Sequence, residues 1–397
     1  MVTVTAQPAS WHRGAVLFAL MLAAFTFNTA ENLPIGLLEL ISEGLRVSVP
    51  SVGYLVTGYG VTVAVASLPL AHATRTMPRR QVLSGVLAAL VVSSLVAALA
   101  PSYGVLLGAR LLTALAQALF WAVMGPVAVG LFPAEVRGRV IGVLSVAGSL
   151  ALVLGVPTGT WLGHHSDWPV PLAALGGLGL LSLVTIAALL PTSRPEEGHA
   201  AYGSAPDTRR FATVLTVGIL SATGAFAGFT YIVTFLGDVS GFSTGTINLL
   251  LVTFGIACLA GVGVTGALLD RFPRAALGAA VAVQAVGMLG LYATGSDPVA
   301  AVVFLTVMGC ALGPVFMATQ HEMLRCAPGR TDMALAANSG GYNAGIAAGA
   351  AIGALLLPRV EVRGTFLAGG LLAVGACAVL LVERLLPHGS VRTPAHN

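Results

Sequence analysis

The chain has 397 residues, of which 56% are hydrophobic and only 9% are charged, and its formal net charge is +4. An ordinary soluble domain carries about 25% charged residues, so this chain has too few charges to cover the surface of a soluble protein of its size. The composition excludes a soluble enzyme, a soluble nucleic-acid-binding protein and a disordered chain. It indicates an integral membrane protein.

In chain order, twelve apolar segments are long enough to cross a bilayer as helices, which takes about 20 residues each. We predict spans at residues 14–38, 51–73, 81–100, 104–131, 139–163, 168–190, 211–237, 246–269, 275–294, 299–321, 334–357 and 364–385. Strands of a membrane barrel alternate apolar and polar residues with a period of two, and these segments do not. The sequence therefore predicts an all-α integral membrane fold with twelve transmembrane helices.

The distribution of arginine predicts which way the chain is inserted, because short cytoplasmic loops are rich in basic residues. The chain has no lysine, so all 19 basic residues are arginines. If the N-terminus is inside, fifteen arginines lie in cytoplasmic segments, namely residues 13, 75, 79, 80, 137, 139, 194, 209, 210, 271, 274, 325, 330, 384 and 392. Arg46, Arg359 and Arg363 lie outside, and Arg110 lies within a span. We therefore expect both termini to be cytoplasmic.

Several features recur at an offset of about 190–195 residues. Ser48 precedes the second span as Ser243 precedes the eighth, and Arg79 ends a loop as Arg274 does. Gly155, Gly159 and Gly163 in the fifth span are matched by Gly345, Gly349 and Gly353 in the eleventh. We predict an N-terminal six-helix half at 1–191, a cytoplasmic linker at 192–210 and a C-terminal six-helix half at 211–397. Because glycines let helices approach closely, we expect the two glycine ladders to form the sliding seam between the halves.

The loop between the eighth and ninth predicted spans carries a recognisable sequence signature. Residues 266–274 read Gly-Ala-Leu-Leu-Asp-Arg-Phe-Pro-Arg and resemble the G-x-L-a-D-R-x-G-R loop of the major facilitator superfamily. The counterpart at residues 70–80 keeps the basic end and lacks the aspartate. Residues 29–38 resemble the bacterial drug/proton antiporters of the chloramphenicol-resistance and arabinose-efflux-like kind. The resemblance implies two pseudo-symmetric halves with the substrate between them, in a bacterial cell membrane.

Two charged residues stand out because they lie away from the ends of their predicted spans, where a charge costs at least about 2.5–3.5 kcal/mol. Glu31 is about seven residues from the outer end of the first span, and Arg110 is about six residues from the outer start of the fourth. At 1.5 Å per residue both lie roughly 9–11 Å below the outer surface, so they can meet. We expect Glu31 to bind the proton and Arg110 to tune its affinity. A structural ion pair and a carboxylate in vestibule water are the alternatives.

Polar side chains mark candidate walls of a substrate cavity. Asn28, Glu31 and Asn32 fall on one face of the first span, which lines a cavity or forms helix–helix hydrogen bonds. In the fourth span, a stripe at helical spacing contains Arg110, Thr113, Gln117, Trp121 and Met124. Such a mixture of polar, aromatic and methionine side chains suits varied ligands. A packing face is the alternative interpretation.

The last six spans offer weaker candidates. Tyr231 and Thr234 share a face of the seventh span, and Met317 and Gln320 share one of the tenth. We expect these residues to line the same cavity, although a core stripe explains them nearly as well. The loop containing Asp270, Arg271 and Arg274 is expected to be a cytoplasmic gate that latches neighbouring helices, with the ordinary excess of cytoplasmic arginine as the alternative.

These features together predict proton-coupled efflux of a small amphiphilic compound, such as a drug or antibiotic, by alternating access. Export of a sugar or another polar metabolite by the same fold is the alternative. We expect a monomeric carrier that works with protons and a small-molecule substrate in the lipid bilayer, without nucleic acid. We expect no enzymatic activity and no nucleotide cofactor, because no nucleophile–base pair or phosphate-binding glycine loop is present. We expect no metal, because the four cysteines show no C-x-x-C spacing.

The arginine distribution predicts the position of the C-terminus. A green fluorescent protein fused after Asn397 should fluoresce in cells, and alkaline phosphatase fused at the same place should be inactive, because the first reporter folds in the cytoplasm and the second requires export. Active phosphatase with a dark fluorescent fusion would contradict the predicted even number of spans.

Overall fold

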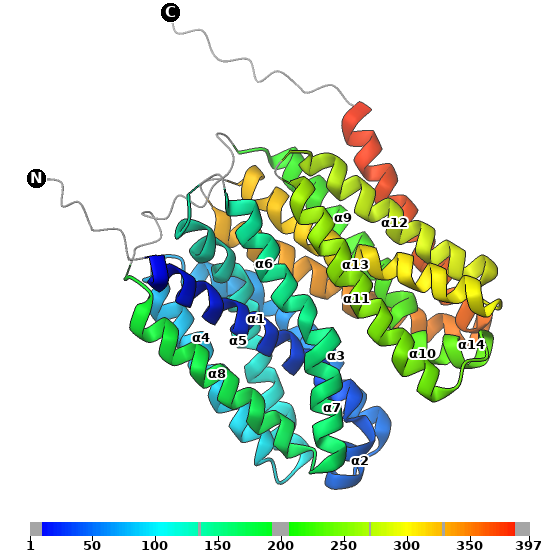
Figure 1. The fold of residues 1–397 in the computed structure, drawn as a ribbon, viewed down its shortest axis with the longest axis horizontal. Helices are drawn as coiled ribbons and strands as arrows, with labels where there is room; N and C mark the ends of the chain where they lie inside the picture. The colour runs from blue at the N-terminus through cyan, green and yellow to red at the C-terminus, as the bar shows by residue number, and fades with distance from the viewer. Residues whose placement is uncertain (1–9, 134–135, 193–205, 270, 328–329, 386–397) are drawn as a thin grey trace, which may run out of the picture.

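The computed structural model describes residues 10–133, 136–192, 206–269, 271–327 and 330–385. Within these ranges every regular element is a helix (Figure 1). Twelve segments are long and apolar enough to cross a membrane. The prediction of an all-α membrane protein with twelve spans is therefore confirmed.

The first six spans run from α1 to α8. They are formed by α1 (Ser10–Gly36), α3 (Val49–Ala73), α4 (Arg79–Ala98), α5 (Tyr103–Gly130), α6 (Arg137–Leu150) continued by α7 (Val156–His165), and α8 (Pro169–Leu189). The short helix α2 (Leu38–Leu45) follows α1, and the π-helical segment η2 (Ala151–Gly155) joins α6 to α7. Pro157 at the start of α7 lacks an N–H group, which is consistent with the change of helix geometry there.

The last six spans run from α9 to α14. They are formed by α9 (Thr208–Phe229), α11 (Thr244–Leu269), α12 (Pro273–Thr294), α13 (Pro298–Cys326) and both parts of α14 (Thr331–Leu385). Non-helical backbone at Val360 and Glu361 divides α14 into two spans. The short α10 (Ile232–Thr234) and η4 (Phe235–Val239) follow α9.

Matching caps begin corresponding helices of the two sets of spans. The Ser48 hydroxyl accepts a hydrogen bond from the backbone N–H of Ser51 at 3.4 Å, before the second span. The Ser243 hydroxyl accepts one from the backbone N–H of Thr246, also at 3.4 Å, before the eighth. A side-chain acceptor at this position satisfies an N–H group that the first helical turn leaves unpaired. The sequence repeat thus corresponds to a repeated local structure.

The two sets of spans lie side by side (Figure 1). Among the described residues, the apolar cores that contain residues of both sets lie towards one end. We call this the terminal end, where α1 begins and α14 ends. One of these cores consists of residues of the first six spans together with Ala336 of α14. The other consists of residues of the last six spans together with Val129 of α5 and Ile141 of α6. Near the opposite end, the core around Leu33 and the core around Phe235 each draw on one set alone. Burial between the sets is thus concentrated towards the terminal end.

The glycine ladders do not lie where the sequence had suggested. A Cβ atom added to Gly155 or Gly159 would clash with Thr29 or Leu33 of α1, within the first six spans. A Cβ atom on Gly345 would lie 2.7 Å from the carbonyl oxygen of Ile219 in α9, within the last six spans. The prediction of a sliding seam between the halves is wrong, because each ladder binds two helices of the same set tightly together.

Other glycines do mark close contacts between the sets. A Cβ atom on Gly340 of α14 would lie 3.1 Å from the carbonyl oxygen of Ala64 in α3. One on Gly125 of α5 would lie 3.0 Å from Leu335 of α14. These positions lie in the parts of α3, α5 and α14 nearer the terminal end, and they let the helix backbones approach each other there.

Candidate functional site

Glu31 is held in a hydrogen-bonded network that joins three helices. The amide nitrogen of Gln117 on α5 donates to Glu31 Oε2 at 2.7 Å. The hydroxyl of Tyr59 on α3 donates to Gln117 Oε1 at 2.6 Å. Both Tyr59 and Gln117 are 1% exposed, whereas Glu31 on α1 is partly exposed. We call Glu31, Gln117, Tyr59 and the adjacent Arg110 the Glu31 network.

Arg110 approaches Glu31 as predicted, but it contacts the backbone of α1. Its guanidinium donates to the carbonyl oxygen of Ala30, and to that of Glu31 at 2.9 Å. Its Cζ atom also lies 4.5 Å from the centre of the Tyr59 ring, which gives a cation–π contact. Among the described residues, the ion pairs do not include one between the Arg110 guanidinium and the Glu31 carboxylate.

The proline in α1 explains this choice of partner. In a helix the carbonyl of residue i accepts from the N–H of residue i+4, and Pro34 has no N–H to offer to Ala30. Arg110 supplies the missing donor. A guanidinium that is only 2% exposed thus receives carbonyl and aromatic partners in place of a carboxylate.

Within the described part of the chain, the Glu31 carboxyl is bound by a neutral amide and not by a guanidinium. Its hydrogen bond comes from an amide N–H, and an amide can donate to a carboxylate or to the carbonyl oxygen of a neutral carboxylic acid. Two nitrogens of the Arg110 guanidinium have carbonyl acceptors of their own, and its Nε is buried without a hydrogen-bond partner among the described residues.

The polar face of α1 also includes Asn28 and Asn32. The Asn28 amide donates to the carbonyl oxygen of Gly148 on α6 at 3.1 Å. The Asn32 amide donates to the carbonyl oxygen of Asn28 at 2.9 Å. Both asparagines are partly exposed. In this conformation Asn28 forms the helix–helix hydrogen bond that was one of the two interpretations of this face.

The residues of the predicted stripe on α5 face different neighbours. Thr113 donates to the Ser93 hydroxyl of α4 at 2.8 Å and so faces the interior of the first six spans. Gln117 faces Glu31. Trp121 and Met124 are buried in an apolar core. The stripe covers roughly 80° of the helix at 100° per residue, which is enough for its edges to face different helices.

An aromatic column connects the two sets of spans beside the network. It begins at Phe27 and Phe120, whose ring centres are 4.8 Å apart, and Trp121 follows at 5.6 Å from Phe120. The Trp121 ring then meets Phe316 of α13 edge-on at 5.8 Å, and Phe316 lies 4.8 Å from Tyr342 of α14. Trp121 therefore contacts the opposite set of spans, as a residue between the halves should.

The candidates in the last six spans have more varied surroundings. The Tyr231 hydroxyl donates to the carbonyl oxygen of Ala350 at 3.1 Å, and Thr234 is exposed. Met317 is fully buried in an apolar core, which matches the alternative interpretation of a core stripe. Gln320 is 8% exposed.

Sequence reasoning missed several polar atoms on α14 that are buried without a hydrogen-bond partner among the described residues. They are the Asn338 amide nitrogen, the Ser339 hydroxyl and the Asn343 amide oxygen. Buried polar atoms are normally paired, so a polar ligand or water is the expected partner. A search for amides within apolar spans would have found both asparagines.

The residues of the predicted gate contribute little to the described contacts. Asp270 lies outside the described residues, and Arg271 and Arg274 are exposed. The counterpart loop instead supplies Arg79, whose guanidinium forms a buried ion pair with Asp332 at the start of α14. This pair joins the two sets of spans at the terminal end. The sequence of this loop did not indicate the pair, because the loop lacks the signature aspartate.

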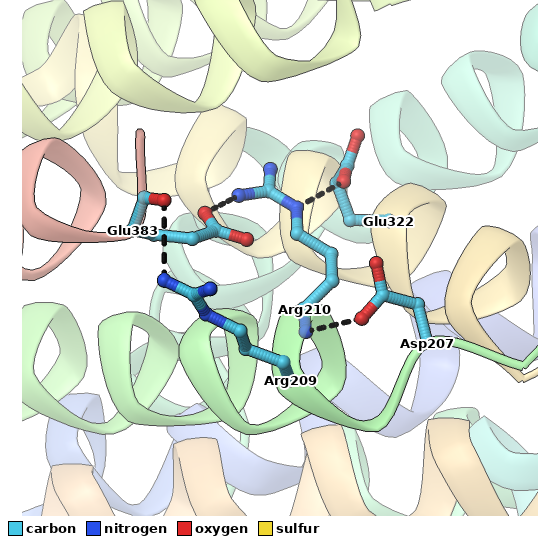
Figure 2. Close-up of polar contacts among 5 residues, drawn as sticks. All are labelled: Asp207, Arg209, Arg210, Glu322 and Glu383. Atoms are coloured by element: carbon cyan, nitrogen blue, oxygen red, sulfur yellow. Dashed lines mark hydrogen bonds and ion pairs between the residues drawn. The ribbon is translucent and has the colours of Figure 1, made fainter. Parts of the chain in front are cut away.

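A second charge cluster lies within the last six spans at the same end (Figure 2). Arg210 of α9 pairs with Glu322 of α13 at 2.8 Å, and also with Glu383 of α14. The backbone N–H of Arg210 donates to the Asp207 carboxylate at 2.8 Å. The Arg209 guanidinium donates to the backbone carbonyl of Glu383 at 3.4 Å. These contacts fix α9, α13 and α14 to one another.

Comparisons with known proteins agree with this architecture. The family model described as Major Facilitator Superfamily matches residues 18–246 and 214–396. A curated protein of Helicobacter acinonychis (strain Sheeba), named "Probable sugar efflux transporter", is 29% identical over 90% of this chain and 92% of its own length.

Solved structures share the fold at low sequence identity. The human organic anion transporter MFSD10 (TETRAN) superposes with a TM-score of 0.74 at 17% identity, over 94% of this chain and all of its own. The proton:xylose symporter XylE gives 0.75 at 15% identity, over 95% of this chain and 96% of its own. FucP in the outward conformation gives 0.71 at 13% identity, over 92% and 98%.

The Arg79–Asp332 pair should stabilise closure of the terminal end. Asp332→Asn leaves a buried arginine without its counter-charge, which typically costs about 3–5 kcal/mol, so the two sets of spans should separate there. Pulsed electron paramagnetic resonance between spin labels at Met77 and Arg330, in a background without the native cysteines, should report a longer distance.

The reversed pair Arg79→Asp with Asp332→Arg should restore the original distance, and the exposed Glu43→Gln variant should leave it unchanged. An unaltered distance in Asp332→Asn would mean that apolar packing alone holds this end closed.

Proposed function

The chain belongs to the major facilitator superfamily, and on this premise we propose that it exports a small solute in exchange for protons. It is a membrane carrier of this family and not an enzyme. The observation that carries the proposal is the Glu31 network, in which an ionisable carboxyl within a span is bound by an amide and lacks an arginine partner. Ionisable groups inside transporters commonly serve as proton sites.

The proposed orientation places both termini in the cytoplasm of a bacterial cell, across its inner membrane. The excess of arginine on that side supports it. The proposed working bodies are the halves at 1–191 and 211–397, joined by a cytoplasmic linker at 192–210. The terminal end is then the cytoplasmic end.

The proposed conformation is outward-facing. The Arg79–Asp332 pair and the close approach at Gly340 both hold the halves together at the cytoplasmic end. Among the described residues near the outer end, the cores around Leu33 and Phe235 each consist of residues of one half.

The proposed exchange alternates a proton and a solute at one carrier. In the outward state, Glu31 is partly exposed and takes a proton from outside while the solute leaves. After the halves rock, Glu31 releases the proton inside and the next solute binds. One proton driven by 100 mV yields about 2.3 kcal/mol, which supports a solute gradient of roughly fifty-fold.

Arg110 has a defined place in this cycle. It stays bound to the Ala30 carbonyl in the outward state, so it does not compete with the proton for the carboxyl oxygens. Movement of α1 about Pro34 in the inward state brings the guanidinium to the carboxylate, which favours the ionised form and releases the proton. Arg110 thereby couples the position of α1 to proton affinity.

The proposed substrate is a small amphiphilic compound such as a drug or antibiotic. The Trp121, Phe316 and Tyr342 rings support this choice, because they form an aromatic wall that contains residues of both halves. Aromatic and polar groups together suit ligands with an apolar body and a few hydrogen-bonding groups.

A sugar is the second candidate substrate. The relative named as a probable sugar efflux transporter favours it. So do the unpartnered Asn338, Ser339 and Asn343 atoms, because a sugar is bound by several convergent hydrogen-bonding groups and these lie on a single helix. An amphiphilic substrate should depend mainly on the aromatic rings, and a sugar should depend mainly on these polar atoms of α14.

Replacement of Glu31 by Gln should separate transport from proton coupling. Gln mimics the neutral acid and cannot titrate, so inverted vesicles given an acid interior should lose at least tenfold in accumulation of substrate. Counterflow between two pools of substrate should continue, because it needs no net proton movement. The assay is radiolabelled uptake with and without an uncoupler.

Glu43→Gln is the matched control, since Glu43 is an exposed glutamate on α2. It should accumulate substrate normally. Normal accumulation by Glu31→Gln would assign coupling to another group, and loss of both accumulation and counterflow would show a defect in binding or folding.

Replacement of Trp121 by Ala should separate the two substrate candidates. Loss of the ring removes an aromatic contact worth about 0.5–1.5 kcal/mol beyond its buried area, so export of planar amphiphiles should fall about tenfold. Asn343→Leu should leave these compounds nearly unaffected. Measurements of export from loaded cells, over a panel of planar amphiphiles and sugars, check this.

A sugar carrier would give the reverse pattern in the same panel. Asn343→Leu would then abolish sugar export, and Trp121→Ala would reduce it only mildly. An equal loss for every compound in Trp121→Ala would indicate that the ring packs the core and does not contact the substrate.

A further inference from the structure

A groove outside the proposed transport path runs between α12 and the last span of α14. It has a volume of about 370 Å³. Small residues of α12 form one wall, including Gly278, Ala279 and Ala282, and Cys377 and Leu381 of α14 lie on the other. The groove extends from Ala275 to Ala282 along α12, a length of about 10 Å at 1.5 Å per residue.

The groove opens towards the lipid. Ala279, Ala282 and Leu381 are exposed and belong to transmembrane spans, so in a membrane these surfaces meet hydrocarbon. A Cβ atom added to Gly278 would meet no other atom within 4 Å. The space above this glycine is therefore not filled by the described side chains.

The end of the groove at the terminal end is basic. Arg274 and Arg384 line it and are both exposed. Among the described residues, the ion pairs involve neither of them. Arg274 also lies in the first turn of α12, where the positive end of the helix dipole favours an anion.

Arg210 adds a buried donor to the same end. Its side chain is 4% exposed and lines the groove. Its Nε and Nη1 atoms are taken by Glu322 and Glu383, as Figure 2 shows. Its Nη2 atom is buried without a hydrogen-bond partner among the described residues. This nitrogen is shielded from the groove, and Glu322 and Glu383 balance the Arg210 charge, so contacts to a bound anion rest on Arg274 and Arg384.

We propose that this groove binds one anionic phospholipid of the leaflet at the terminal end. One acyl chain lies along the small residues of α12, and the phosphate meets Arg274 and Arg384. Basic pockets between spans recognise anionic headgroups in this way. An apolar groove that ends in unpaired arginines at headgroup depth matches a phospholipid in both its chain and its charge.

The test uses the full-length protein in detergent and native mass spectrometry. Phosphatidylglycerol and phosphatidylcholine with identical acyl chains are titrated separately. The wild-type protein should hold one phosphatidylglycerol at concentrations at which phosphatidylcholine does not stay bound. Each arginine contributes about fivefold to binding of an anionic lipid, so Arg274→Gln with Arg384→Gln should lower the affinity for phosphatidylglycerol at least tenfold.

Gly278→Leu tests the groove itself. The leucine side chain fills the open space, so the bound lipid should be lost. Leucine also has a higher helix propensity than glycine, so the thermal unfolding temperature should not fall. Gly263→Leu is the matched control, because a Cβ atom there also meets nothing and Gly263 is exposed on α11. Arg325→Gln is the control for charge, because Arg325 is exposed and does not line the groove.

Two results would overturn the proposal. Equal retention of both lipids by the wild-type protein would exclude recognition of an anionic headgroup. Normal retention of phosphatidylglycerol by Gly278→Leu would exclude this groove as the place of binding. Loss of a protein dimer in Gly278→Leu, without loss of lipid, would assign the groove to a second copy of the chain and would equally refute the lipid site.

Discussion

The missing N–H of Pro34 is the constraint around which the membrane-buried charges are arranged. A carbonyl without a donor inside a bilayer costs several kcal/mol, and Arg110 satisfies the carbonyl of Ala30 that Pro34 leaves. The same contact solves a second problem, because a buried guanidinium also needs acceptors. The unpaired carbonyl of Ala30 and the buried guanidinium of Arg110 thus stabilise each other. The Tyr59 ring adds a cation–π contact to the guanidinium.

This arrangement explains how a glutamate and an arginine can be neighbours without neutralising each other. Two nitrogens of the Arg110 guanidinium have backbone carbonyl acceptors and its face covers the Tyr59 ring, whereas the Glu31 carboxyl accepts its hydrogen bond from the amide of Gln117. A direct ion pair would hold the carboxylate ionised and would cost several kcal/mol to break. The structure therefore leaves the Glu31 carboxyl without an arginine ion pair among the described residues while it fixes the position of the nearby charge.

The sequence could predict the spans and the depth of the charges, because both depend on hydropathy and on a fixed rise per residue. It could not predict the partner of Arg110, since this depends on which carbonyl a proline leaves open across two helices. The role of Tyr59 could not be predicted for a related reason. The sequence does not show that its hydroxyl reaches Gln117 on another helix and donates a hydrogen bond to it. The position of the glycine ladders was predicted wrongly, because regular glycine spacing indicates close helix packing but does not identify the helix that packs there.

The two charge clusters at the terminal end differ in what they connect. The Arg79–Asp332 pair crosses from α4 to α14 and must break if the halves part there. The contacts of Arg210 with Glu322 and Glu383 lie within the last six spans and survive such a movement. A rocking carrier needs both kinds of contact, because one sets the balance between states while the other keeps a half rigid. The loop with the degenerate signature supplies the first, so the presence of a motif alone does not identify the contact that holds the halves together.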